Sequence, residues 1–149
     1  MPLSVKAAAL RFLKIRPRSI FELKEKLEAK GFSDDEIAAT IHDLIVSGLL
    51  DDRAFTKSWI NYRLARPFGF RRIIQELKAK GIDQEIIDQA ITEVDDKYNS
   101  QEVALELVQR RWQRLPALDP QKKKKRVMDF LLRRGFEIDT VLKVLKRIK

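Results

Sequence analysis

The residue types that could perform catalysis are few in this sequence. His42 is the single histidine, and there is no cysteine. A Ser-His-Asp arrangement could therefore be built only around His42, and a thiolate nucleophile or thiolate metal site is excluded. The phosphate-holding patterns G-x-x-x-x-G-K-[ST] and G-x-G-x-x-G are also absent. We interpret His42 as an ordinary helix residue, and we expect no enzymatic activity, no ATP hydrolysis and no cofactor.

Three carboxylate pairs are the candidates for metal binding, since Mg²⁺ takes oxygen ligands from acidic side chains. They are Asp34-Asp35, Asp51-Asp52 and Asp95-Asp96. The first two pairs stand at predicted helix starts, where aspartate caps free backbone N–H groups. Capping is therefore favoured over metal binding, and we expect no metal site.

Basic side chains recur in stretches that hold no acid, at 1–21, at 53–75 and between Glu106 and Asp119, with a further run at 122–126. Such clusters are typical of surfaces that contact phosphate or an acidic protein. We expect them to form one continuous basic stripe that binds a partner. The predicted stripe comprises Arg16, Arg18, Arg63, Arg66, Arg71, Arg72, Arg110, Arg111, Arg114, Lys122, Lys123, Lys124, Lys125 and Arg126.

Two further features allow a binding or a structural interpretation. The run at 122–126 opens a predicted helix, where positive charge opposes the helix dipole; an anionic partner would relieve this, and a solvated helix start is the alternative. Trp59, Tyr62 and Trp112 lie among arginines and could stack on bases. Core packing is favoured for them, because Phe55, Trp59 and Arg63 follow i, i+4, i+8 with apolar neighbours.

One local motif occurs three times and shows how the chain is organised. Each copy has a leucine, a cation, a glycine and an apolar residue, with the glycine four positions after the leucine. In the Schellman motif, glycine at C′ takes positive φ and the next apolar residue packs back on the leucine at C3. The predicted structural residues are Leu27, Gly31 and Phe32, then Leu77, Gly81 and Ile82, then Leu131, Gly135 and Phe136.

The glycines are 50 and 54 residues apart, so we interpret the chain as three copies of one unit of about 50 residues. We assign the extra four residues to the proline-containing loop 115–120. The predicted repeats are 1–50, 51–99 and 100–149, of which the third is basic, with 14 basic and six acidic residues.

Apolar residues at helical spacing predict three helices in each unit. Capping boxes at Ser19 and Ser33, aspartates at 51–52 and 83, and prolines at 17 and 67 mark their ends. The predicted helices span about 5–15, 19–31, 33–47, 51–66, 70–80, 83–94, 100–112, 121–134 and 137–148. Nothing alternates at period two, so the fold class is all-α, with three tandem three-helix repeats in an elongated, curved array.

Composition fits this class. The chain has 149 residues, 44% hydrophobic and 36% charged, and a net charge of +9. Its first residues lack a long apolar run, and no segment approaches the ~18 apolar residues of a membrane span. We expect a cytoplasmic monomer with no membrane partner.

The middle unit resembles the RecX family. The residues that carry the resemblance are Leu50-Asp51-Asp52, Phe55, Trp59-Ile60 and Arg63, followed by Gly69, Arg72-Ile73 and Gln75-Glu76-Leu77 up to Lys80-Gly81-Ile82. Arg18-Ser19 to Phe32 and Phe130 to Phe136 are similar to the same family. One departure is Arg66-Pro67-Phe68, where a glycine-containing turn would be expected.

The resemblance implies a non-enzymatic regulator of the RecA recombinase, acting in recombination and SOS DNA repair. By this resemblance the partner is the RecA filament on single-stranded DNA. The regulator would lie in the filament groove and inhibit ATP hydrolysis, filament growth and strand exchange. The basic stripe would face acidic recombinase surface or, as an auxiliary contact, single- or double-stranded DNA.

Two alternatives stay open. A helix-turn-helix protein that acts directly on DNA would also combine three-helix units with basic turns. The acids on the second and third helices of the first two units argue against groove readout. A nuclease is the third possibility, and it requires one of the carboxylate pairs to bind metal.

Overall fold

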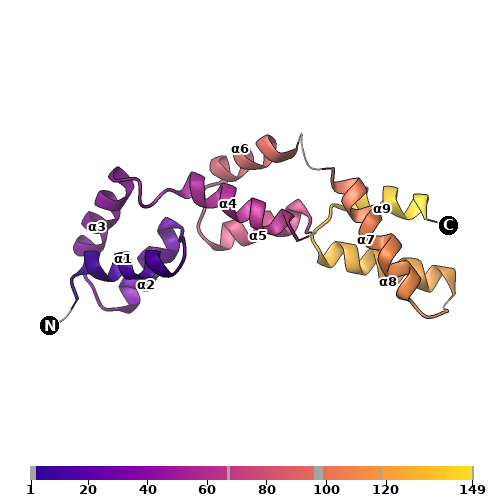
Figure 1. Ribbon diagram of the computed structural model, residues 1–149, viewed down its shortest axis with the longest axis horizontal. Coiled ribbons are helices and arrows are strands. Elements are labelled where there is room, and N and C mark those ends of the chain that lie inside the picture. The colour runs from indigo at the N-terminus through magenta and orange to yellow at the C-terminus, as the bar shows by residue number, and fades with distance from the viewer. Residues whose placement is uncertain (1–2, 67, 96–98, 118, 149) are drawn as a thin grey trace. The chain divides into compact units, whose positions relative to one another are not determined.

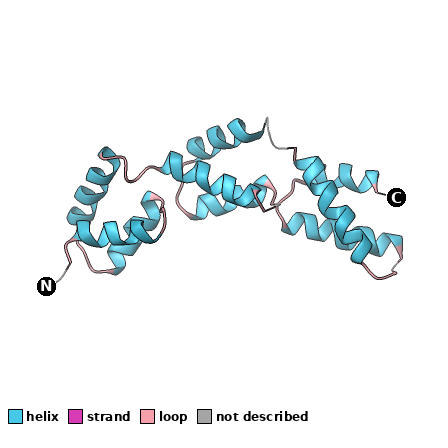
Figure 2. Cartoon of the chain, in the orientation of Figure 1, coloured by secondary structure: helices cyan, strands magenta, loops and turns pink. Residues whose placement is uncertain are grey.

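The structure is a computed structural model that describes residues 3–66, 68–95, 99–117 and 119–148. Within these ranges every regular element is an α-helix (Figure 2). None of the helices described there is both long and apolar enough to cross a membrane. In chain order (Figure 1) they are α1 Val5–Ile15, α2 Ile20–Ala29, α3 Asp34–Val46, α4 Asp52–Leu64, α5 Phe70–Ala79, α6 Gln84–Asp95, α7 Ser100–Arg114, α8 Pro120–Arg133 and α9 Ile138–Arg147.

The helices begin where the capping residues predict. Ser19 and Glu22 form a complete capping box at the start of α2, with each side chain accepting a hydrogen bond from the other residue's backbone N–H. Ser33 caps α3 by accepting from the Glu36 N–H at 3.2 Å, while the Glu36 carboxylate accepts from the Ser33 hydroxyl. The all-α prediction is confirmed, and the caps explain the positions of these helix starts.

All three predicted Schellman motifs are confirmed. Gly31, Gly81 and Gly135 have φ of 89°, 75° and 93°. Each glycine N–H and the N–H after it bond back to the last turn of its helix; in the second copy Ile82 donates to the Leu77 carbonyl at 3.1 Å. All three C3 leucines are buried. A fourth helix end, at Gly48, uses the same device with φ of 79°.

The chain divides into two compact units, 1–59 with 77–88 and 60–76 with 89–149. The predicted repeat boundaries at 50 and 99 do not coincide with this division, because the middle repeat contributes residues to both units. The first unit buries Leu23, Leu27 and Leu44 in its core. The second buries Val108, Leu131 and Phe136. Each unit therefore has its own hydrophobic core.

In the first unit, the end of α5 is joined to the start of α2. The Ser19 hydroxyl donates to the Lys80 carbonyl at 2.7 Å, and the Lys80 ammonium reaches the Glu22 carboxylate at 3.3 Å. The Asp52 carboxylate accepts from the Ile20 N–H at 2.9 Å. A Cβ on Gly81 would overlap the Phe21 side chain. We call these contacts the first joint.

In the second unit, the end of α8 meets the start of α5 in the same way. Gly69 N–H donates to the Arg134 carbonyl at 2.8 Å, and Arg71 N–H donates to the Gly135 carbonyl at 3.1 Å. A Cβ on Gly135 would overlap the backbone of Arg72, and one on Gly69 would overlap Gly135. We call these contacts the second joint. In both joints the free carbonyls at a helix C-terminus accept from the N-terminal end of another helix, which satisfies groups that helix ends leave unpaired.

The 54-residue spacing has a different cause from the predicted one. The loops before α5 and before α8 both have five residues, so the loop before α8 does not supply the four extra residues. The helix α8 has 14 residues where α5 has 10, and α7 has 15 where α4 has 13. The repeat is longer chiefly because α8 has one more turn at its start, and the lysine run begins on this added turn.

Candidate anion-binding site

The two predicted stripe residues of the first unit have structural contacts. Arg16 bonds the Glu22 carboxylate at 2.7 Å and keeps a side chain that is 42% exposed. Arg18 is only 8% exposed; it donates to the Phe12 carbonyl and lies over the Phe12 ring. Burial, and then the nearby Arg16, lower the pKa of Arg18, while Glu22 partly offsets both. Arg18 is thus a packing residue, and we remove it from the proposed surface.

Glu22 and Asp52, the two partly buried carboxylates of the first joint, have pKa values that shift in opposite directions. Burial alone would raise the pKa of Glu22, but hydrogen bonds from Arg16, the Ser19 N–H and Lys80 outweigh it and lower the pKa to about 2. Burial raises the pKa of Asp52, and the Ile20 N–H offsets only part of that effect. Glu22 is therefore a stabilising anion of the joint.

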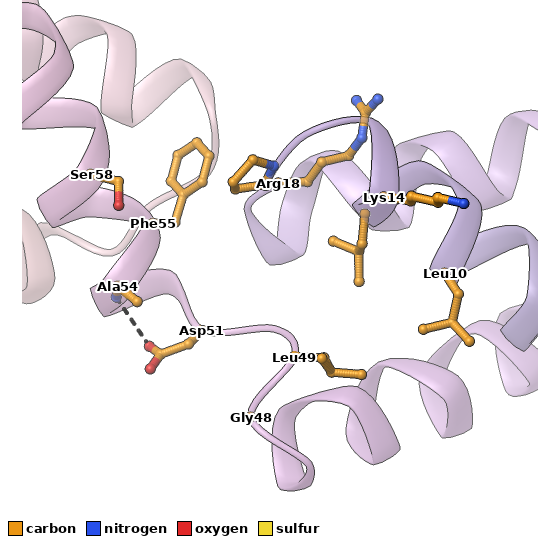
Figure 3. Close-up of a pocket in the computed structure, with 11 residues that line it drawn as sticks. Leu10, Lys14, Arg18, Gly48, Leu49, Asp51, Ala54, Phe55 and Ser58 are labelled. Atoms are coloured by element: carbon orange, nitrogen blue, oxygen red, sulfur yellow. Dashed lines mark hydrogen bonds between the residues drawn. The ribbon is translucent and has the colours of Figure 1, made fainter.

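A pocket of about 460 Å³ lies in the first unit between α1 and α4. Figure 3 shows Leu10 and Phe55 facing it from opposite sides. Its acidic member, Asp51, accepts hydrogen bonds from the N–H groups of Arg53 and Ala54. Asp51 thus caps α4, as predicted, and the pocket is mainly apolar.

The predicted capping role is not confirmed for Asp34 and Asp35, because the side chain of Ser33 caps α3. His42 lies on α3, and Asp34 and Asp35 lie in the first turn of that helix. Asp96 lies outside the described residues. Among the residues that are described, no group of three acidic or histidine side chains could hold a metal ion.

In the second unit, the arginines near the end of α4 differ in exposure. Arg63 forms an ion pair with Glu76, and both side chains are about one-fifth exposed. Arg66 is exposed and lies over the Tyr62 ring at 5.1 Å, with Tyr62 itself 49% exposed. Arg66 is therefore presented to solvent, whereas Arg63 ties α4 to α5.

Phe68 holds a cluster of guanidinium groups at the second joint. The ring has Arg63 at 5.0 Å, Arg72 at 4.6 Å and Arg134 at 5.1 Å from its centroid. Arg72 also donates to the Arg133 carbonyl. Arg134 is not among the predicted site residues, because its place before Gly135 is explained by the helix dipole alone. Arg71, beside this cluster, is exposed.

A second group of arginines lines a pocket between α7 and α8. Arg110, Arg111, Arg114 and Arg134 surround it, and its volume is about 420 Å³. The ring of Phe130 lies beneath two of them, with Arg111 4.2 Å and Arg134 5.2 Å from the ring centroid. None of the described residues that line this pocket is acidic. We call it the arginine pocket.

The lysine run lies at the start of α8. Lys122, Lys124, Lys125 and Arg126 are exposed, while Lys123 lies over the Trp112 ring at 4.8 Å. This helix start has no side-chain cap from Asp119. Positive charge therefore accumulates at an uncapped helix N-terminus, where it opposes the dipole.

The predicted aromatic residues are mostly packed. Trp112 packs against the core of the second unit. Trp59 stacks on Phe55 at 6.1 Å and carries the Lys80 ammonium 4.4 Å from its ring. Tyr62 is the exposed member of the three, so core packing describes two of them.

The second unit thus presents most of the predicted cations: Arg66 and Arg71 near the second joint, the arginine pocket, and the lysine run. Arg16 and Arg18 belong to the first unit, so the continuity of a stripe across the whole chain stays a prediction.

The sequence matches three family models in series. They are the first three-helix domain of RecX at residues 6–44, the second at 51–91 and the third at 99–145. The chain belongs to the RecX family. Proteins named regulatory protein RecX are similar to it over nearly their whole length: one from Legionella pneumophila is 33% identical, covering 95% of this chain and 93% of the relative. One from Chlorobaculum tepidum is 35% identical, covering 94% and 85%.

Solved RecX structures share the fold. The crystal structure of RecX from Lactobacillus salivarius superposes with a TM-score of 0.81 at 24% identity, over 96% of this chain and 93% of that one. A second RecX crystal structure gives 0.84 at 22% identity, over 97% and 72%. Each of the three matched RecX domains contains one copy of the glycine motif, at Gly31, Gly81 and Gly135.

Proposed function

We propose that this chain regulates the RecA recombinase by binding its filament on DNA and inhibiting ATP hydrolysis, filament growth and strand exchange. The observation that carries the proposal is the series of three RecX domains along one chain. The relatives it matches are named regulatory proteins, which supports action by binding and not by catalysis.

The charge distribution supports a filament as the partner. A filament on DNA combines protein surface with phosphate, and cations on the second unit would be attracted to both. Arg66 and Arg71 are the best candidates for this contact, because both are exposed and the described hydrogen bonds of the second joint do not use either side chain. Arg63 and Arg72 are less suitable, since they hold α4 to α5 and α5 to α8.

A pull-down with the RecA protein of the same organism tests the proposal. We expect the chain to retain RecA strongly when single-stranded DNA and a non-hydrolysable ATP analogue are both present, and weakly when either is omitted, because the proposed partner is RecA assembled on DNA with nucleotide bound. Retention that is equal in all conditions would contradict binding to the filament, and no retention in any condition would contradict the partner.

A further inference from the structure

The arginine pocket contains more positive charge than the fold requires. Cations in the last turn of a helix are favoured by the dipole, and this accounts for Arg111 and Arg114 on α7 and for Arg134 at the end of α8. It does not account for Arg110, which precedes the last turn of α7 yet lines the same pocket. Arg110 and Arg114 also repel each other, because residues four apart are neighbours on a helix surface.

The Phe130 ring orients two of these guanidinium groups. Arg111 and Arg134 both lie over Phe130 within about 5 Å of its centroid. A guanidinium that stacks on an aromatic ring uses its flat face, so the N–H groups at its edge point away from the ring. Arg111 is thereby held beside Arg110 and Arg114 around one space of about 420 Å³, and Arg134, whose guanidinium also lies over Phe68, borders the same space.

We propose that the arginine pocket is a phosphate-binding site. A phosphate group offers several acceptor oxygens and matches the fork of arginine N–H donors in a bidentate way, so one phosphate can engage several guanidiniums. Its negative charge would also relieve the repulsion among the four cations. The phosphate belongs to a nucleic-acid strand or to a free nucleotide, which share this chemistry. The inference does not rest on the proposed function, since it needs no RecA.

Binding of a fluorescein-labelled single-stranded oligothymidylate, followed by anisotropy over a range of salt concentrations, tests the site. Arg110→Ala with Arg114→Ala should weaken binding about 10-fold or more, and should lower the salt slope by about 0.7 for each phosphate that the variant no longer neutralises. The matched control is Lys143→Ala with Lys146→Ala, which removes the same charge from α9. The control should bind nearly as the unchanged protein does.

A conservative variant separates a phosphate site from general attraction. Arg110→Lys with Arg114→Lys keeps the charge and loses the bidentate fork, so we expect it to bind several-fold more weakly than the unchanged protein. Circular dichroism should show unchanged helicity, because both residues are exposed. Equal binding by the alanine pair, the lysine pair and the α9 control would overturn the proposal.

Competition assigns the source of the phosphate. If ATP displaces the oligothymidylate from the unchanged protein, and ATP binding is itself weakened by the alanine pair, the pocket takes a free nucleotide. If ATP fails to compete, and binding of the oligothymidylate depends on Arg110 and Arg114, the pocket binds a nucleic-acid strand. If neither the oligothymidylate nor ATP depends on these arginines, the site does not bind phosphate.

Discussion

Glu22 shows how a single side chain holds the first joint. Its carboxylate accepts from Arg16 and Lys80 and from the Ser19 N–H, and its pKa falls from 4.5 to about 2. A carboxylate with a lowered folded pKa stabilises the fold at pH values above its unfolded pKa, and that contribution is lost as pH falls through the folded pKa. The first joint should therefore weaken in acid.

We predict that acid reduces the free energy of unfolding between pH about 4.5 and about 2, with Glu22 contributing roughly 1–2 kcal/mol of the loss after solvent screening. Urea unfolding at several pH values measures it. In Glu22→Gln this part of the acid loss should be absent, and the variant should be less stable than the unchanged protein at pH 7. Identical pH profiles for the two proteins would contradict this role.

The sequence alone does not show which arginines are exposed and available to a partner and which are packed against other side chains. Arg18 and Arg16 stand two residues apart in one basic cluster, yet Arg18 is buried against Phe12 and Arg16 remains partly exposed. Arg63 and Arg66 differ in the same way. The difference depends on which aromatic ring or carboxylate comes near in the fold, and this is not visible in the local pattern.

Five glycines lie at helix ends or at the two joints, and they are required there for different reasons. Gly31, Gly48, Gly81 and Gly135 all need positive φ, but only Gly81 and Gly135 are also in contact with another helix at a joint. Gly69 has the opposite combination: its φ is not positive, and an added Cβ would overlap Gly135. Positive φ and close contact with another helix are therefore two independent requirements for glycine in this chain.

We predict a graded series of alanine substitutions. Gly31→Ala and Gly48→Ala should each cost about 1–2 kcal/mol, for the left-handed backbone alone. Gly81→Ala and Gly135→Ala should cost about 1–3 kcal/mol more, because the joint must open. Gly69→Ala should lose only the stability of the joint contact, because the φ of Gly69 is not positive. Denaturant unfolding of the five variants measures the series, and equal losses at Gly31 and Gly81 would show that the joint contributes nothing.

The helices could be predicted closely from the sequence, because caps and Schellman glycines are local signals. The predicted ends at residues 15, 31 and 134 differ from the observed ones by at most two residues. The joints could not be predicted, since they pair groups about 60 residues apart, such as Ser19 with Lys80. The predicted helix 121–134 already included the added turn of α8, and only the assignment of the extra four residues to the loop 115–120 was wrong.

At the scale of the whole molecule, positive charge is concentrated late in the chain. Residues 100–149 carry 14 basic and six acidic side chains, while residues 1–99 are nearly balanced. The second compact unit contains the arginine pocket and the lysine run, and its segment 60–76 adds the exposed Arg66 and Arg71. The sequence predicted this concentration, whereas the grouping of arginines around Phe68 and Phe130 required the fold.

The most direct test of the regulatory function is ATP hydrolysis by RecA on single-stranded DNA, with increasing amounts of this chain. We predict inhibition by the unchanged protein. Arg66→Glu with Arg71→Glu should need a concentration about 10-fold or more higher for half inhibition, because two exposed cations at the interface become anions.

The matched control is Lys143→Glu with Lys146→Glu, which makes the same change of charge on α9 of the same unit. This control should inhibit nearly as well as the unchanged protein. Inhibition that is equal in all three proteins would contradict the proposed surface, and the absence of any effect of the unchanged protein on RecA would contradict the function.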